Sequence, residues 1–109
     1  LAETVAAALG VGYRVRMRHA SAPVATAAVP RQALEAAARE EGVATLFLLS
    51  GANHDAGILG AHLPTAMIFV PSRDGRSHCP EEHTDWCHIE DAARVLHGAA
   101  LALAGAGDG

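Results

Sequence analysis

Residues 64–82, PTAMIFVPSRDGRSHCPEE, decide the fold that the sequence predicts. Residues 66–70 form a short and almost wholly apolar run between two prolines, which is typical of a central strand covered on both faces. Turn-forming residues follow this run, and His78 comes directly after them. Because catalytic groups often lie on loops at the ends of rigid strands, we expect this loop to carry part of a functional site.

A helix and a second buried strand are predicted upstream of this stretch. The helix begins at Pro30 or Arg31 and continues to about Glu41, where Gly42 ends it. Its inward face is predicted to carry Leu34, Ala37 and Ala38. The apolar run at residues 45–49 then predicts the strand.

Two further helices complete this half of the chain. A short helix is expected from His54 to about Ala61, and the last helix has small and apolar residues at three-four spacing. The predicted apolar face of the last helix carries Ile89, Ala92, Ala93, Leu96, Ala99, Ala100 and Leu103. Glu90 and Asp91 are expected in its first turn, where the helix dipole favours negative charge. The alternation of helix and strand predicts an α/β fold with two adjacent parallel strands and a right-handed crossover.

The N-terminal part has a different pattern. Residues 1–9 predict the end of a helix that Gly10 stops, and residues 13–19 alternate between apolar residues and arginines, as in a half-buried antiparallel strand. The arginine row is either a solvated strand face or a contact for an anionic ligand. Residues 21–30 contain two prolines and no periodicity, which indicates a hinge. We therefore expect one domain to end at about residue 22, a hinge at 23–30, a second domain at 31–104 and a disordered tail at 105–109.

Composition excludes several classes of protein. The 109 residues are 50% hydrophobic but only 4% aromatic, so the chain is expected to form a weak core by itself. A net charge of −4 argues against a nucleic-acid partner, and no apolar run approaches membrane-spanning length. The chain starts inside a helical pattern without Met or a signal-peptide layout, which we interpret as a truncated beginning. Two cysteines define no disulfide framework, which favours a reduced, cytoplasmic setting.

Polar clusters follow both predicted strands, at residues 50–55 and 75–82. If the strands are parallel, these clusters meet at one edge of the sheet, where His54 and His78 could ligate a metal or donate to an oxyanion. Asp55 could orient a ring or hold a helix N-terminus.

Two alternatives stay open. Each histidine could be an ordinary polar residue of a loop, or the chain could be a small metal-binding or structural module. The zinc-ligand types in that module would be Cys79, His83, Cys87 and His88, at spacings of four, four and one.

The segments SGANHDA (50–56), PTAMIFVPSRDGRSHCPEE (64–82) and EDAARVLHGAALALA (90–104) resemble the C-terminal part of one amidohydrolase family. This family comprises the N-carbamoyl-L-amino-acid hydrolases, allantoate amidohydrolases and β-alanine synthases, within the dinuclear-metal aminoacylase and carboxypeptidase superfamily. The family pattern resembles S-G-A-G-H-D-A, then M-I-F-V-P-S, then G-x-S-H-x-P-x-E. As a pair these motifs are specific, and the resemblance covers nearly the whole chain.

The resemblance implies a fold, a reaction and roles for named residues. The fold would be the closing part of a mixed-sheet catalytic domain, preceded by the last helix and strand of an inserted α+β dimerisation and lid domain. The reaction would be hydrolysis of a linear amide by metal-activated water, with two divalent ions (zinc or manganese, or else cobalt or nickel). His78 would be a metal ligand, His54 and Asn53 would contact the substrate, with His54 also at the oxyanion, and Asp55 would support them.

The same resemblance implies what this chain lacks. The remaining metal ligands, the general base and the arginine that grips a substrate carboxylate lie in family segments absent from these residues, so the chain alone is expected to be inactive. Its partners would be a small-molecule substrate, the missing part of its own catalytic domain and a second copy in a homodimer. Two positions depart from the pattern. Asn53 replaces the usual Gly, and Cys79 replaces a small polar residue beside the metal ligand.

Overall fold

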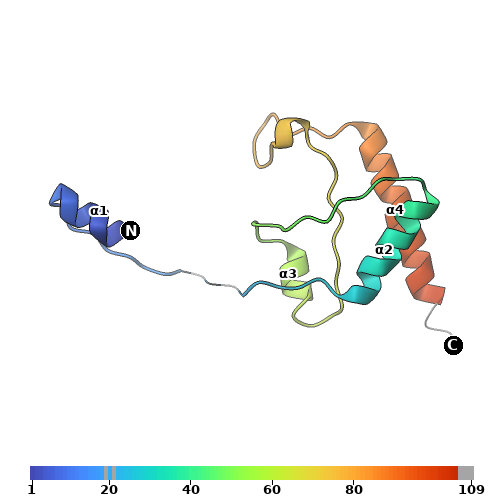
Figure 1. The fold of residues 1–109 in the computed structure, drawn as a ribbon, viewed down its shortest axis with the longest axis horizontal. Coiled ribbons are helices and arrows are strands. Elements are labelled where there is room, and N and C mark those ends of the chain that lie inside the picture. The colour runs from blue at the N-terminus through green and yellow to red at the C-terminus, as the bar shows by residue number, and fades with distance from the viewer. Residues whose placement is uncertain (19, 21, 106–109) are drawn as a thin grey trace.

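The computed structural model describes residues 1–18, 20 and 22–105, and it is built from helices joined by extended chain (Figure 1). The elements in chain order are α1 (Ala2–Leu9), α2 (Ala28–Glu40), α3 (Asp55–Leu59), the 3-10 helix η1 (Arg73–Gly75) and α4 (Trp86–Gly105). The described residues contain no strand. The predicted tail is residues 105–109. Gly105 is the last residue of α4, and residues 106–109 lie outside the described residues.

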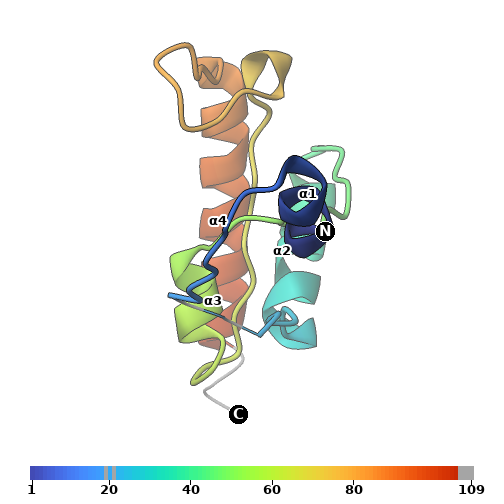
Figure 2. The same cartoon turned by 90° about the vertical axis from the view of Figure 1, so that its left-hand side faces the viewer.

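Helices α2 and α4 lie side by side and form the core (Figures 1 and 2). The buried residues between them are Ala37, Ala38, Val95 and Ala99, and Ala33, Leu34, Val43 and Ile68 pack against this cluster. Small side chains allow the two backbones to approach closely: a Cβ added at Gly98 would lie 3.3 Å from the Cβ of Ala37. The inward face predicted for α2 is therefore confirmed.

The ends of α2 follow local sequence signals. The helix begins at Ala28, two or three residues before the predicted start at Pro30 or Arg31. Pro30 then lies in the first turn, where its missing N–H costs no hydrogen bond. At the other end Gly42 has a left-handed backbone with φ of 68°, and the Val43 N–H donates to the Ala38 carbonyl at 2.8 Å. Gly42 is confirmed as the residue that stops this helix.

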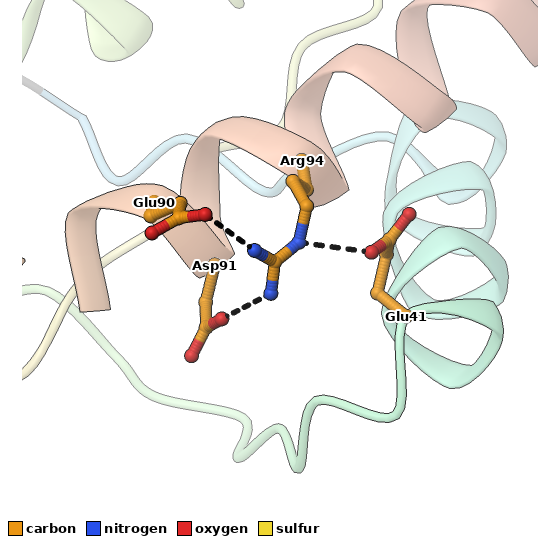
Figure 3. A network of polar contacts seen from close by, with 4 residues as sticks. All are labelled: Glu41, Glu90, Asp91 and Arg94. Carbon is orange, nitrogen blue, oxygen red and sulfur yellow. Dashed lines mark hydrogen bonds and ion pairs between the residues drawn. The ribbon is translucent and has the colours of Figure 1, made fainter. Parts of the chain in front are cut away.

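Helix α4 begins at Trp86, which corrects the prediction about its first turn. Glu90 and Asp91 lie beyond the first turn, so they do not complement the helix dipole as expected. They bind Arg94 instead: its Nη1 donates to Glu90 Oε1 at 3.0 Å and its Nη2 to Asp91 Oδ1 at 2.6 Å (Figure 3). The Arg94 Nε donates to Glu41 Oε2 at 3.0 Å, which ties α4 to the end of α2.

The buried face of α4 is also rotated relative to the predicted one. Val95, absent from the predicted face, is 5% exposed, whereas Leu96 is 58% exposed. Ile89 and Leu103, also on the predicted face, are both more than a third exposed. In a helix so rich in small residues, apolar periodicity fits more than one face, and contact with α2 decides between them.

Helix α1 lies apart from the other helices, with which it makes no contact in the described part of the chain (Figure 1). Gly10 ends it as predicted, with φ of 62° and its N–H directed at the Ala6 and Ala7 carbonyls. The described residues after it, up to Arg18, are extended and exposed. Their predicted strand, the domain boundary near residue 22 and the hinge at 23–30 stay predictions.

The two predicted strands of the second domain are extended segments without a ladder of hydrogen bonds between them. The segment 43–50 is exposed over most of its length, and Leu49 is fully exposed. The segment 65–70 is half-buried as far as Ile68, which packs on the core. The mixed sheet therefore stays a prediction. None of the helices in the described residues is both long enough and apolar enough to cross a membrane.

Candidate functional site

Both polar clusters singled out in the sequence line one concavity of about 600 Å³. Its walls come from residues 48–52 and His54 on one side, and from residues 68–72, 75–78, Glu82 and Thr84 on the other. The structure thus brings His54 and His78 to the same hollow, although the parallel strands from which this was predicted are not formed in the described residues. Apolar residues such as Leu48 and Phe69 also line it, and His54 and His78 are the histidines among its lining residues.

His54 is held by a serine and an aromatic ring. It is the N-terminal cap residue of α3, half-buried, and its Nε2 lies 2.6 Å from Ser50 Oγ. Its ring packs edge-on against Phe69, with ring centroids 5.6 Å apart and planes at 67°. If the Ser50 hydroxyl donates to Nε2, the proton of the neutral ring lies on Nδ1, which then serves as a donor. Ser50 belongs to the polar cluster at residues 50–55, four residues before His54, but no role was predicted for its side chain.

The two neighbours of His54 have lesser roles in this geometry. Asp55 is the exposed first residue of α3, where a carboxylate is favoured by the unpaired N–H groups of the helix. Neither Asn53 nor Asp55 lines the concavity. Asn53 does not have a left-handed backbone, because Asp74 and His78 are the non-glycine residues of the described chain with positive φ. Its replacement of the family's usual Gly is therefore compatible with this turn.

The loop that carries His78 is closed at its base. The Ser72 hydroxyl donates to the Arg76 carbonyl at 2.6 Å, and the Arg73 N–H donates to the His83 carbonyl at 2.8 Å. Asp85, just before α4, accepts from Arg73 Nη2 at 3.3 Å and lies 3.1 Å from His83 Nε2. These contacts fix residues 72–76 to the start of α4, so the loop between them presents His78 from a defined base.

His78 has a left-handed backbone, with φ of 58°. For a residue other than glycine this conformation costs of order 1–3 kcal/mol, and such strain is concentrated at functional sites. The His78 N–H donates to Glu82 Oε2 at 2.9 Å, and hydrogen bonds to a charged acceptor are stronger than those between neutral groups. This bond acts directly on the strained backbone and offsets part of its cost.

The ring of His78 is oriented by its neighbour. Its Nδ1 lies 3.2 Å from Ser77 Oγ, which leaves Nε2 as the nitrogen without a partner in the described chain. A neutral imidazole whose other nitrogen is hydrogen-bonded is the usual form of a histidine metal ligand. Ser77 and Glu82 belong to the G-x-S-H-x-P-x-E segment, but no role was predicted for either residue from the sequence.

His78 fits one ligand position of a metal centre, but these residues do not complete one. The described residues contain no group of three or more His, Cys, Asp or Glu side chains placed to hold a metal ion. That includes the four residues of the alternative module, Cys79, His83, Cys87 and His88, which the structure does not bring together as a zinc site. Further ligands for a metal at His78 would have to come from outside the described residues.

Known proteins resemble this chain over most of its length. The model of peptidase family M20/M25/M40 matches residues 2–102. An N-carbamoyl-L-amino acid amidohydrolase of Geobacillus stearothermophilus is 40% identical over 92 residues, which is 84% of this chain and 22% of that protein. An allantoate amidohydrolase of Bacillus subtilis (strain 168) is 44% identical over 59 residues, or 54% of this chain and 14% of that protein.

A third relative, an allantoate amidohydrolase of Escherichia coli (strain K12), is 45% identical over 47 residues, or 43% of this chain and 11% of that protein. The chain thus spans between 11% and 22% of the lengths of these three relatives. No solved structure matches the chain significantly.

Proposed function

Because the chain belongs to peptidase family M20/M25/M40, we propose that it forms the closing part of the catalytic domain of a metal-dependent amidohydrolase. The proposed substrate is a linear amide of the ureido class, such as an N-carbamoyl amino acid or allantoate, in keeping with the names of the relatives. The observation that carries the proposal is the presence of His54 and His78 in one concavity, on the two segments that resemble the amidohydrolase motifs.

The two histidines have different roles in this proposal. The proposed site holds two divalent ions, zinc or manganese. His78 is a ligand of one of them, through the Nε2 that Ser77 leaves available. Such ions, when bound, supply a water that is activated for attack on a carbonyl carbon. His54 donates a hydrogen bond to the substrate oxygen, on which negative charge develops as the carbonyl carbon becomes tetrahedral. Ser50 fixes the His54 ring so that this donor is already oriented before the substrate binds.

The rest of the site is supplied from outside these residues. A single histidine cannot hold two metal ions, so the other ligands and the general base must come from the remainder of the catalytic domain. The exposed apolar side chains of residues 46–49 offer a surface for that remainder to cover. We therefore propose that the isolated chain is inactive and that a mixed sheet forms when its partner segments are present. The homodimer and the cytoplasmic location stay predictions.

The test uses a completed enzyme, in which this chain replaces the matched residues of the Geobacillus stearothermophilus relative. His78→Ala should lower the metal content, and excess metal should restore part of the activity, because the first loss is one of affinity. His54→Ala should leave the metal content near normal and lower kcat by roughly a hundredfold or more, the usual effect of removing one oxyanion donor. Metal stoichiometry and steady-state kinetics, measured on the same preparations, separate the two roles.

Asp55→Asn provides the matched control, because Asp55 is adjacent to His54 but does not line the concavity. Its effect on kcat should be smaller than that of His54→Ala. Loss of metal in His54→Ala with full metal in His78→Ala would reverse the assigned roles. If neither substitution changed metal content or kcat, the proposed function would be wrong at its two central residues.

A further inference from the structure

The motif around His78 contains a carboxylate that the proposed mechanism does not use. We propose that Glu82 is a positioning residue for His78: its side chain holds the backbone of His78 in the left-handed conformation that directs the ring into the concavity. This inference rests on the proposed role of His78 as a metal ligand. It explains why a glutamate lies four residues after the histidine.

The chain between the two residues is shaped to bring the carboxylate back. The Glu82 N–H donates to the Cys79 carbonyl at 3.1 Å, which closes a turn over residues 79–82. Pro80 occupies the second position of that turn, where its fixed φ is favoured. The turn reverses the chain, so Glu82 Oε2 reaches the His78 N–H at 2.9 Å. A glutamate one residue earlier or later would leave the turn in a different direction.

Two hydrogen bonds then fix His78, one on its backbone and one on its ring. Glu82 accepts from the main-chain N–H, and Ser77 Oγ lies 3.2 Å from Nδ1. With both restrained, Nε2 has one direction in which to meet a metal ion. Pre-orientation of this kind increases metal affinity, and loss of such a partner typically weakens binding by about 10- to 100-fold.

Glu82 could act in two other ways, because it lines the same concavity as His78. It could bind the metal directly, or it could attract the metal by its negative charge. The neutral glutamine side chain separates these possibilities from a hydrogen bond to the backbone, since its amide oxygen still accepts from the His78 N–H but carries no charge. Glu81 is the matched control: it is the same residue type, exposed, adjacent in sequence and not part of the concavity wall.

The experiment measures Zn²⁺ affinity of the completed enzyme by competition with a chelating dye, and the visible absorption spectrum after loading with Co²⁺. Glu82→Ala should weaken Zn²⁺ binding by about 10-fold or more and alter the Co²⁺ spectrum, because the His78 ring is no longer fixed. Glu82→Gln should stay within about threefold of the parent enzyme and keep its spectrum. Glu81→Ala should change neither quantity.

Each other outcome overturns the inference. Equal losses in Glu82→Gln and Glu82→Ala would assign the effect to charge or to direct binding of the metal. A Glu82→Ala variant that binds Zn²⁺ like the parent, beside a His78→Ala variant that has lost it, would show that Glu82 has no positioning role while the proposed function holds. If His78→Ala itself keeps its metal, the proposed function fails first. Circular dichroism of all variants verifies that the exposed loop substitutions leave the fold intact.

Discussion

The helices α2 and α4 differ from the extended segments that lead to the candidate site in where their backbone N–H and C=O groups find hydrogen-bond partners. Each helix makes its own hydrogen bonds, so the pair needs only a stripe of small side chains to bury its core. The extended segments 43–50 and 65–70 make no ladder with each other, and the first exposes most of its apolar side chains. A helix is complete within one segment, whereas a strand requires a neighbour to supply its partners.

This difference predicts where the chain would depend on the remainder of the proposed catalytic domain. The buried residues of the α2–α4 core are three alanines and one valine, so the stabilisation that burial supplies is small. His54 follows the extended segment 43–50, and His78 lies in the loop after the segment 65–70. The half that folds by local rules is therefore not the half that bears the proposed chemistry.

The largest expected effect is on the extended segments. In the chain alone, the amides of residues 45–49 should exchange with solvent almost as fast as in an unfolded peptide, whereas in the completed enzyme strand pairing should slow them by at least about a hundredfold. Hydrogen exchange read by mass spectrometry measures both states.

The chain alone should also associate or melt without cooperativity, because its apolar surface is uncovered. A monodisperse monomer with a cooperative melt and protected strands would contradict the comparison.

A smaller effect is expected within the helix pair. Val95→Ala should lower the free energy of unfolding of the completed enzyme by about 1–3 kcal/mol, because it removes buried methyl groups between α2 and α4. Leu96→Ala is the neighbouring control and should cost less than about 0.5 kcal/mol, since Leu96 is exposed. Urea denaturation of the two variants measures the difference. A greater loss in Leu96→Ala would mean that the face predicted from periodicity is the one buried in the completed enzyme.

The smallest effect is expected for the ion pairs between α2 and α4. Arg94→Gln should destabilise the completed enzyme by about 1 kcal/mol at low salt, because it leaves three neighbouring carboxylates without their shared cation (Figure 3). The loss should shrink in high salt, since all of these side chains are partly exposed. Adding Glu41→Gln to Arg94→Gln should restore part of the stability by removing one of the repelling charges. Thermal melts at two salt concentrations measure this loss of stability. A loss that is the same at both concentrations would contradict the prediction.

Features set by the local chain were predicted correctly from the sequence. Gly10 and Gly42 end their helices because only a residue without Cβ adopts their left-handed backbone without strain. The inward face of α2 was also predicted, since charged residues leave a single apolar stripe. In α4 the same reasoning failed, because its small residues fit several faces and Glu90 and Asp91 suggested too late a start.

The sequence by itself indicated where the main helices lie, the glycines that stop two of them, the family and the two segments that bear histidines. Only the tertiary structure decided which side of α4 is buried, because that choice depends on the surface of α2 rather than on α4. The structure also showed that His78 takes a left-handed backbone with Glu82 on its N–H, a local contact within one turn that apolar periodicity does not reveal. Local sequence sets which backbone conformations are inexpensive, and contacts between distant segments select among those that remain.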